Sequence, residues 1–386
     1  MLLSNLLLGC GGPPPTADTS GWATWRRVDN AYAERFQIWE RGADRLLLVF
    51  GHGGIQDTVG RYVVTTDDPS PLPVSALQLT PGLKEVATGS TTHVPYIAAL
   101  GALEAIAACA HTDQVRDTVF ASRVRQGLVR EIALGDGLDR EVLIAMRPRI
   151  FFGYPFGRGD AGALEQAGIP VVEVSEYLEE HPLGRAEWLR FFGVLLGRER
   201  LADSLFSGIR QRYEAIRADS TTRDRPSVLF GSVWSGQWWV PPGNSYMARF
   251  IEDAGGRYVF ADRTGHGNIA VDMETMITVG AQAERWGMIA QLRYPVVLSD
   301  FTGGDPRLEA FRSVEQNGLF IGNSSQADLF GQALVEPDRE LLDLIIALHP
   351  DGDYFQRDLP VVPAGYFRHV EWPVIPTVSF GNAEAQ

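Results

Sequence analysis

The sequence has little cysteine, almost no lysine and no long hydrophobic run. Its 386 residues include two cysteines, Cys10 and Cys109, which are too few for a framework of disulfide bonds. Lys84 is the only lysine, so a site for an anion must use arginine. The net charge of −14 argues against a nucleic-acid partner, which requires a basic face. No stretch reaches the roughly 18–20 apolar residues of a membrane-spanning helix.

The two cysteines differ in their surroundings. Cys109 lies in an alanine-rich run, which is typical of a small buried residue. Cys10 follows Leu6-Leu7-Leu8-Gly9 and precedes a stretch rich in Gly and Pro. This pattern resembles a bacterial lipoprotein signal, in which the cysteine is lipidated and residues 1–21 serve as signal and tether. The segment departs from the pattern because it has no Lys or Arg before Cys10, and a chance leucine run is the alternative.

The rest of the chain has a globular composition, with 45% hydrophobic and 21% charged residues. Its length is enough for two ordinary domains with sizeable cores. After residue 83, and again after residue 220, short strand-like runs alternate with helical segments, including a helix over 94–108 and a strand over 296–299. This alternation predicts an α/β protein with mostly parallel sheets and helices on their faces.

The predicted elements divide the chain into five parts. They are a signal and tether over 1–21, an N-terminal α/β lobe over 22–183, an inter-lobe helical segment over 184–219, a C-terminal α/β lobe over 220–349 and a tail over 350–386. The start of the first lobe, residues 22–74, is rich in strands, which we expect at 36–40, 45–50 and 61–65. The inter-lobe segment carries apolar residues three and four apart and is interrupted at Gly197.

Four motifs in a fixed order carry a family resemblance. They are Gly89-Ser-Thr-Thr-His-Val-Pro-Tyr-Ile-Ala-Ala-Leu-Gly101, Asp139-Arg-Glu-Val-Leu-Ile-Ala-Met-Arg-Pro148, Gly168-Ile-Pro-Val-Val172 and Asp253-Ala-Gly-Gly-Arg257. From about Leu83 to His349 the chain resembles the periplasmic substrate-binding proteins of ABC importers for ferric siderophores, haem and cobalamin. The resemblance implies two Rossmann-like lobes joined by a single long rigid helix, with the ligand cleft between the lobes. Residues 22–64 lie outside it.

The resemblance also implies a function. The protein would not be an enzyme but the substrate-binding lipoprotein of an ABC importer, without a cofactor of its own. Its cargo would be a metal chelate such as an iron–siderophore, haem or cobalamin. It would deliver this cargo, as a monomer, to a permease dimer in the inner membrane with its ATPase. The implied location is periplasmic or extracytoplasmic, with the membrane anchor at a lipidated Cys10.

Two glutamates match the positions that contact the permease in this family. One glutamate on each lobe pairs there with permease arginines, and the matching residues here are Glu141 and Glu274. Both are expected in the first turn of a helix. A carboxylate at that place also stabilises the helix dipole, so simple helix stabilisation is the alternative.

Ligand contacts are expected from the loops that follow strand ends, where open α/β sheets place their crevice. Three tryptophans within six residues, at 234, 238 and 239, predict an aromatic wall for a large flat chelate, with burial in the core as the alternative. We expect at least two of them to line the cleft. The full set of expected ligand-binding residues is Ser90, Thr91, Thr92, His93, Tyr96, Tyr154, Phe156, Trp234, Trp238, Trp239, Phe301 and Thr302.

An enzymatic interpretation rests on Gly51-His52-Gly53-Gly54, which resembles the oxyanion loop of α/β-hydrolases. The Gly-x-Ser-x-Gly motif that would supply a nucleophile does not occur in the sequence. The seven histidines show no metal-ligand spacing, so no metal site of the protein's own is expected. An extracytoplasmic hydrolase that uses the 51–54 loop remains the alternative function.

Overall fold

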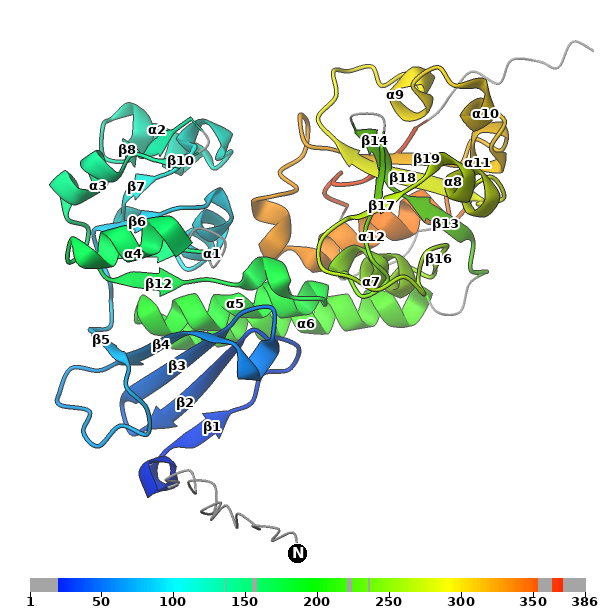
Figure 1. Cartoon of the computed structure of the whole chain (residues 1–386). Coiled ribbons are helices and arrows are strands. Elements are labelled where there is room, and N and C mark those ends of the chain that lie inside the picture. The colour runs from blue at the N-terminus through cyan, green and yellow to red at the C-terminus, as the bar shows by residue number, and fades with distance from the viewer. Residues whose placement is uncertain are drawn as a thin grey trace, which may run out of the picture.

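The structure is a computed structural model of the chain, and it describes residues 20–135, 137–154, 158–220, 224–234, 237–352 and 363–370. Two α/β lobes stand side by side, and a separate five-stranded sheet lies beside the first lobe and the helices that join the lobes (Figure 1). No helix in these ranges combines the length and the apolar character needed to cross a membrane.

The N-terminal sheet is a meander that follows the short 3-10 helix η1 (Ser20–Thr24). Its strands are β1 (Arg26–Val28), β2 (Phe36–Arg41), β3 (Asp44–Phe50), β4 (Thr58–Val64) and β5 (Leu77–Leu79). The first four pair antiparallel in sequence order, and β5 joins β4 in parallel. The strands predicted at 36–40 and 45–50 are confirmed, and β4 contains most of the third. Successive residues of β3 face opposite sides, so Leu46 packs in a small outer cluster and Leu47 in the main core.

The first lobe is built on an entirely parallel sheet with strand order β12-β11-β6-β7-β8. Its strands are β6 (Val86–Thr88), β7 (Ile106–Cys109), β8 (Arg130–Glu131), β11 (Ile150–Gly153) and β12 (Val171–Glu173). The helices between them are α1 (Val94–Ala99), α2 (Thr118–Arg125), α3 (Arg140–Met146) and α4 (Arg158–Gln166), and a small hairpin consists of β9 (Ala133–Leu134) and β10 (Gly137–Leu138). The helix predicted over 94–108 is therefore wrong beyond Ala99, because the alanine-rich end of that segment pairs as β7.

The second lobe repeats the pattern with strand order β16-β13-β18-β19-β20, in which only β20 is antiparallel. These strands are β13 (Ser227–Phe230), β16 (Arg257–Tyr258), β18 (Arg285–Ala290), β19 (Leu319–Asn323) and β20 (Arg368–His369). A second, antiparallel sheet consists of β14 (Ser232–Trp234), β15 (Gln237–Val240) and β17 (Ile269–Val271). The helices are α7 (Tyr246–Asp253), α8 (Met273–Gly280), α9 (Leu298–Thr302), α10 (Pro306–Glu309), α11 (Arg312–Glu315) and α12 (Pro337–Leu348).

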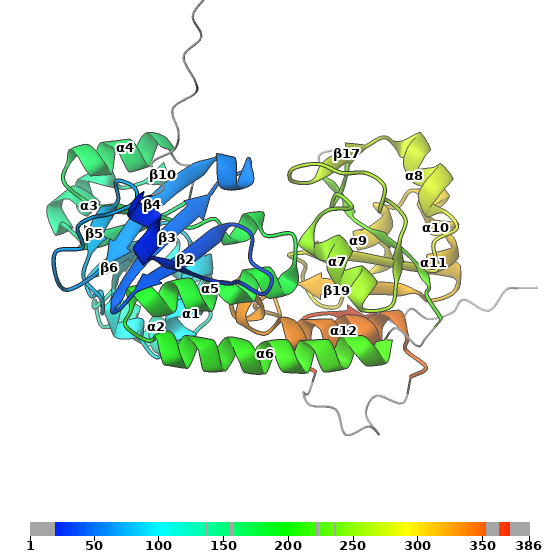
Figure 2. The same cartoon turned by 90° about the horizontal axis from the view of Figure 1, so that it is seen from below.

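The lobes are joined by two successive helices rather than by the single long helix that was predicted. These are α5 (Pro182–Leu195) and α6 (Glu199–Ser220), and the chain turns between them at Gly197, whose φ of +65° suits glycine. Helix α6 runs beneath both lobes, beside α12 (Figure 2). Its Glu199 accepts a hydrogen bond from Arg45 of the N-terminal sheet at 2.8 Å, and its Tyr213 hydroxyl donates to Asp253 of the second lobe at 2.8 Å.

Two buried carboxylates attach the N-terminal sheet to the rest of the molecule. Glu187 on α5 is fully buried and accepts hydrogen bonds from the backbone N–H groups of residues 31, 32 and 33. Glu179, just before α5, accepts from the N–H groups of Glu34 and Arg35 at 2.9 and 3.0 Å. Backbone donors satisfied by buried carboxylates form strong, charge-assisted bonds. The connection between β1 and β2 is therefore fixed to the helices that join the lobes.

Candidate functional site

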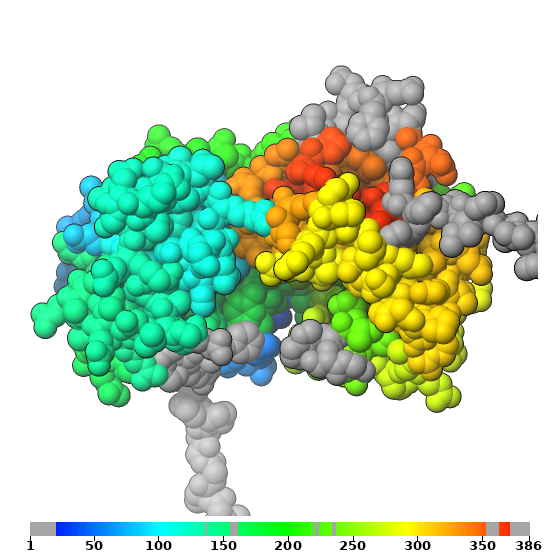
Figure 3. All heavy atoms as spheres, turned by 90° about the horizontal axis from the view of Figure 1, so that it is seen from above, coloured from blue at the N-terminus to red at the C-terminus, as the bar shows by residue number. Residues whose placement is uncertain are grey.

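Loops that follow the parallel strands of both lobes meet at the gap between the lobes. From the first lobe these loops bring Thr91 after β6, Asp113 after β7 and Tyr177 after β12. From the second lobe they bring Ser232 after β13 and Ser324 after β19. Seen from above, the gap is a hollow between the cyan first lobe and the yellow and green second lobe (Figure 3). Open α/β sheets bind ligands at this place, so the inter-lobe cleft is the candidate site.

The cleft contains two hollows that share one aromatic residue. The Trp239 hollow has a volume of about 370 Å³, and its walls include Tyr177, Trp239 and Tyr246. The Arg116 hollow has a volume of about 530 Å³ and lies between residues 113–117 of the first lobe and residues 327–332 of the second. Phe330 lines both hollows and is 53% exposed. Each volume lies within the usual range of about 300–1,000 Å³ for small-molecule sites.

Polar contacts bridge the lobes around these hollows. Asn244 of the second lobe donates to Glu180 at 2.9 Å, and Arg116 of the first lobe donates to the backbone carbonyl of Ser324. The guanidinium of Arg185 on α5 lies 4.0 Å from the ring centre of Tyr246 on α7, which is within cation–π range. These contacts fix the width of the cleft in this structure.

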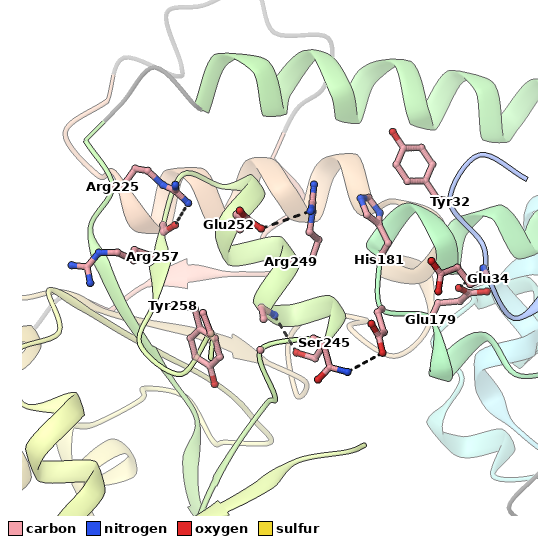
Figure 4. Close-up of a pocket in the computed structure, with 16 residues that line it drawn as sticks. Tyr32, Glu34, Glu179, His181, Arg225, Ser245, Arg249, Glu252, Arg257 and Tyr258 are labelled. Atoms are coloured by element: carbon pink, nitrogen blue, oxygen red, sulfur yellow. Dashed lines mark hydrogen bonds and ion pairs between the residues drawn. The ribbon is translucent and has the colours of Figure 1, made fainter. Parts of the chain in front are cut away.

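A third hollow, of about 450 Å³, lies on the other side of the Asn244–Glu180 contact and faces α5 and α6, the helices that join the lobes (Figure 4). We call it the hinge hollow. Two of the three arginines that line it already have partners within the protein. Arg249 pairs with Asp253 at 3.1 Å, and Arg225 donates to the carbonyl of Gly256 at 3.0 Å. Charged groups with internal partners gain less from a ligand, so this hinge hollow is a weaker candidate than the two hollows of the cleft.

Burial changes the proton affinity of one carboxyl group in the cleft wall. Glu179 lines the Trp239 hollow and is almost completely buried, which raises its pKa to about 7. Hydrogen bonds from the backbone at Glu34 and Arg35 and from the indole of Trp188 act in the opposite direction. Because these donors hold the carboxyl group in place, it serves first to attach the N-terminal sheet.

The tryptophan cluster forms a β-hairpin rather than the loop that was predicted. Consecutive residues of a strand point to opposite faces, so Trp238 and Trp239 in β15 cannot share a face. Trp239 lines the cleft, and its indole Nε1 has no hydrogen-bond partner among the described residues. Trp238 is 1% exposed and packs against Trp286, so the expectation that it contacts ligand is corrected. Trp234 ends β14, and its side chain lies outside the described part of the structure.

Four other expected ligand-binding residues are buried in the core, which corrects those expectations. Tyr96 stacks on Phe192 at 5.1 Å, and its hydroxyl donates to the carbonyl of Arg185. His93 is fully buried, and burial lowers its pKa to about 3, so it is a neutral core residue. Phe301 and Thr302 belong to α9, each 2% exposed. The strand predicted over 296–299 is wrong, since this segment leads into α9, and the loop expected after it does not exist.

The remaining described residues of the first lobe that were expected to bind ligand differ in their surroundings. Thr91 lines the Arg116 hollow. Ser90 caps the 3-10 helix η3 (Thr91–His93), and Thr92 donates to the buried Glu176 at 2.5 Å, so both hydroxyls have internal partners. Tyr154 follows β11 and is 38% exposed.

The structure does not test three of the sequence predictions, which concern ligand binding by Phe156, lipidation of Cys10 and docking to a permease. Phe156 and Cys10 lie outside the described residues. Glu141 and Glu274 are both exposed, one near the start of α3 in the first lobe and one near the start of α8 in the second. Their role in docking stays a prediction.

Several cleft residues were missed by the sequence analysis. Tyr177 follows the predicted strand before it, so the rule that ligand contacts follow strand ends could have found it. Phe330 and Arg116 lie in segments without a recognisable pattern. His52 and His266 also line the Trp239 hollow, and His52 belongs to the glycine-rich loop that suggested a hydrolase.

Known proteins resemble this chain in sequence and in fold. A model of the family described as periplasmic binding protein matches residues 86–291, which span both lobes and exclude the N-terminal sheet. An uncharacterized lipoprotein of Methanocaldococcus jannaschii is 27% identical over 232 residues, which are 59% of this chain and 54% of the relative. The chain thus spans about half the length of the curated relatives it matches.

Two solved structures share the two-lobed fold. A periplasmic haem-binding protein of Pseudomonas aeruginosa superposes with a TM-score of 0.58 at 17% identity, over 75% of this chain and 98% of that one. A protein of the ABC-type Fe³⁺-hydroxamate transport system of Saccharomonospora viridis has a TM-score of 0.53 at 19% identity, over 68% of this chain and 93% of that one. The family resemblance and the fold class predicted from the sequence are confirmed, apart from the single linking helix.

Proposed function

Because this chain belongs to the periplasmic binding protein family, we propose that it is the substrate-binding protein of an ABC importer and that its cargo is a metal chelate. The observation that supports this most is the inter-lobe cleft, to which the strand-end loops of both lobes contribute. Two lobes that contact one ligand can close around it, and the closed form can be recognised by a transporter.

The chemistry of the cleft fits a large, partly flat cargo. Trp239, Tyr177 and Phe330 present aromatic surface to the cleft. Aromatic walls bind a macrocycle or a catechol through buried area and stacking. The haem-binding and Fe³⁺-hydroxamate transport proteins that share the fold support the same class of cargo.

The proposal extends to partners and location. The permease would contact the two lobes at Glu141 and Glu274, which are exposed and belong to α3 and α8. These two helices lie at the outer parts of their lobes (Figure 1). The protein would act outside the cytoplasm, held at the membrane by a lipid on Cys10. The lipoprotein of Methanocaldococcus jannaschii supports the anchor, and mass spectrometry of the membrane-bound protein tests it through the acyl mass on Cys10.

The hydrolase interpretation has less support. The family match is to binding proteins, and the 51–54 loop lies against the cleft. Its His52 lies beside another histidine there, His266, with 5.2 Å between the ring centres.

A thermal-shift screen tests the proposed cargo class. The full chain is heated with haem, cobalamin and a ferric trihydroxamate, each beside its metal-free counterpart. A ligand present at 100 times its Kd stabilises the folded state by about 2.7 kcal/mol, which shifts Tm by several degrees. We expect at least one metal-loaded form to raise Tm more than its metal-free form does. If none of them shifts Tm at concentrations up to the millimolar range, the proposal is wrong for these chelates.

A further inference from the structure

Two histidines from distant parts of the chain meet at the Trp239 hollow. His52 lies in the connection between β3 and β4 of the N-terminal sheet, and His266 lies in the connection between β16 and β17 of the second lobe. Their ring centres are 5.2 Å apart, and their ring planes are inclined by 68°. Both side chains are exposed and both line the hollow. The pair therefore joins the N-terminal sheet to the second lobe across the cleft.

The loop that carries His52 is held by a network of hydrogen bonds. The N–H of Gly51 donates to the carbonyl of Asp57 at 2.8 Å, and the N–H of Gly54 donates to the carbonyl of Gly51 at 3.1 Å. The guanidinium of Arg35 donates to the carbonyl of Gly51 at 3.2 Å. The backbone N–H of Arg35 itself donates to Glu179, and that of Ala33 donates to Glu187 on α5, so the loop is tied to the region that joins the lobes.

The loop that carries His266 is also tied to the cleft. The N–H of Gly265 donates to the side-chain oxygen of Asn244 at 2.9 Å. The side-chain nitrogen of Asn244 in turn donates to Glu180 at 2.9 Å. Both histidines thus lie on loops whose backbones are positioned by the same inter-lobe region, which keeps the two rings near each other.

The separation of the rings matches the geometry of two imidazoles on one metal ion. A metal–nitrogen bond is about 2.0–2.1 Å long, and the ring centre lies about 1.2 Å beyond the nitrogen. For angles of about 90–110° at the metal, the two ring centres are then about 4.6–5.3 Å apart. The observed 5.2 Å lies within this range. Imidazole nitrogens are suitable ligands for Ni²⁺, Cu²⁺, Zn²⁺ and iron.

We propose that His52 and His266 together bind the metal of the cargo and fill two coordination positions that its chelator leaves open. This inference rests on the proposed function, because the chelator supplies the remaining ligand atoms. It narrows the cargo to chelates with two adjacent open positions. It also gives the N-terminal sheet a role, since His52 comes from a part of the chain outside residues 86–291, which match the family.

Nickel nitrilotriacetate is a suitable probe, because nitrilotriacetate supplies four ligand atoms and leaves two adjacent positions open. The full chain, prepared without a histidine tag, is titrated with this complex by calorimetry. We expect one complex per chain. His52→Ala and His266→Ala should each weaken binding at least tenfold. Both residues are exposed, so the melting temperature of the free protein should stay within about a degree, since surface substitutions cost little stability.

His369→Gln is the matched control. His369 lies on β20 and contacts the carbonyl of Asn317, which precedes β19 at the end of the sheet away from the cleft. This variant should bind the nickel complex as the unmodified chain does. Equal affinity of all four proteins, or binding of the complex by none of them, would overturn the inference.

A second ligand separates this inference from the proposed function. A ferric trihydroxamate has all six positions filled, so its binding should not depend on His52. Suppose that the ferric trihydroxamate binds equally to the unmodified chain and to His52→Ala, and that the affinity for nickel nitrilotriacetate is unchanged in both histidine variants. The inference then fails and the proposed function stands. If the nickel complex binds through the two histidines and every chelate of the thermal-shift screen fails, the inference stands and haem, cobalamin and ferric trihydroxamates are excluded as the cargo.

Discussion

The attachment of the N-terminal sheet depends on one buried side chain, and its replacement has a calculable cost. In Glu187→Gln, one carboxylate oxygen becomes an NH₂ group that faces donors. The carboxylate accepts from the N–H groups of residues 31, 32 and 33 at 2.8–3.1 Å and from Arg190 at 3.0 Å. A hydrogen bond to a charged group contributes about 1.5–3 kcal/mol. Losing the charge and at least one acceptor should therefore lower the free energy of unfolding by about 3 kcal/mol.

Urea unfolding measures this loss, and hydrogen exchange locates it. The amides of residues 31–33 should exchange much faster in Glu187→Gln, because their acceptor is weakened. Glu252→Gln is the matched control. Glu252 is 60% exposed and its ion pair with Arg249 is 3.7 Å long, so its replacement should cost no more than about 0.5 kcal/mol. If the two variants lose the same stability, or if residues 31–33 stay protected in Glu187→Gln, the reasoning is refuted.

Three further predictions concern the cleft, the pH dependence and the docking surface. Trp239→Ala should weaken chelate binding by about 1–3 kcal/mol in a titration, whereas Trp238→Ala should lower the free energy of unfolding by about 3–5 kcal/mol in urea. Burial raises the pKa of Glu340 from 4.5 to about 8, so the folded state holds a proton that the unfolded state releases. The contribution of Glu340 to the free energy of unfolding should be fully present below about pH 4.5 and be lost as the pH rises through about 8. Glu340→Gln should remove this part of the dependence of Tm on pH. Glu141→Arg or Glu274→Arg should abolish uptake into cells while leaving chelate affinity unchanged, because exposed charges guide partners more than they hold cargo.

Each of these expectations has a result that contradicts it. Unchanged affinity in Trp239→Ala would remove the aromatic wall from the site. The same slope of Tm against pH in Glu340→Gln would show that other groups control it. Uptake at the normal rate in both charge-reversal variants would leave helix stabilisation as the role of Glu141 and Glu274.

Local patterns predicted the elements that local interactions determine. Helices α3, α7 and α8 begin where Asp139, Ser245 and Asp272 accept a hydrogen bond from a backbone N–H in the first turn, and such caps are visible in a sequence. The segment that ends at Cys109 was misread, because alanine favours helix and it is the pairing with β6 and β8 that makes the segment a strand. Strand β18 was missed, since a strand buried on both faces shows no alternation.

The candidate site was predicted in part for the same reasons. The rule that ligands lie beyond strand ends placed Thr91 and Trp239 at the cleft. It could not distinguish Trp239 from Trp238, because that depends on which face of the β15 hairpin packs on Trp286. The approach of His52 to His266 depends on how the N-terminal sheet sits against the second lobe, and no local pattern encodes that placement.

The central claim is that one metal chelate binds in the cleft between the lobes. Its most direct test is a calorimetric titration of the full chain with whichever chelate raises Tm, in metal-loaded and metal-free form, repeated with Trp239→Ala. We predict one metal-loaded chelate per chain, weaker binding of the metal-free form, and a loss of about 1–3 kcal/mol in the variant. Binding of several copies per chain, or an affinity that is the same in Trp239→Ala and in the unmodified chain, would contradict the claim.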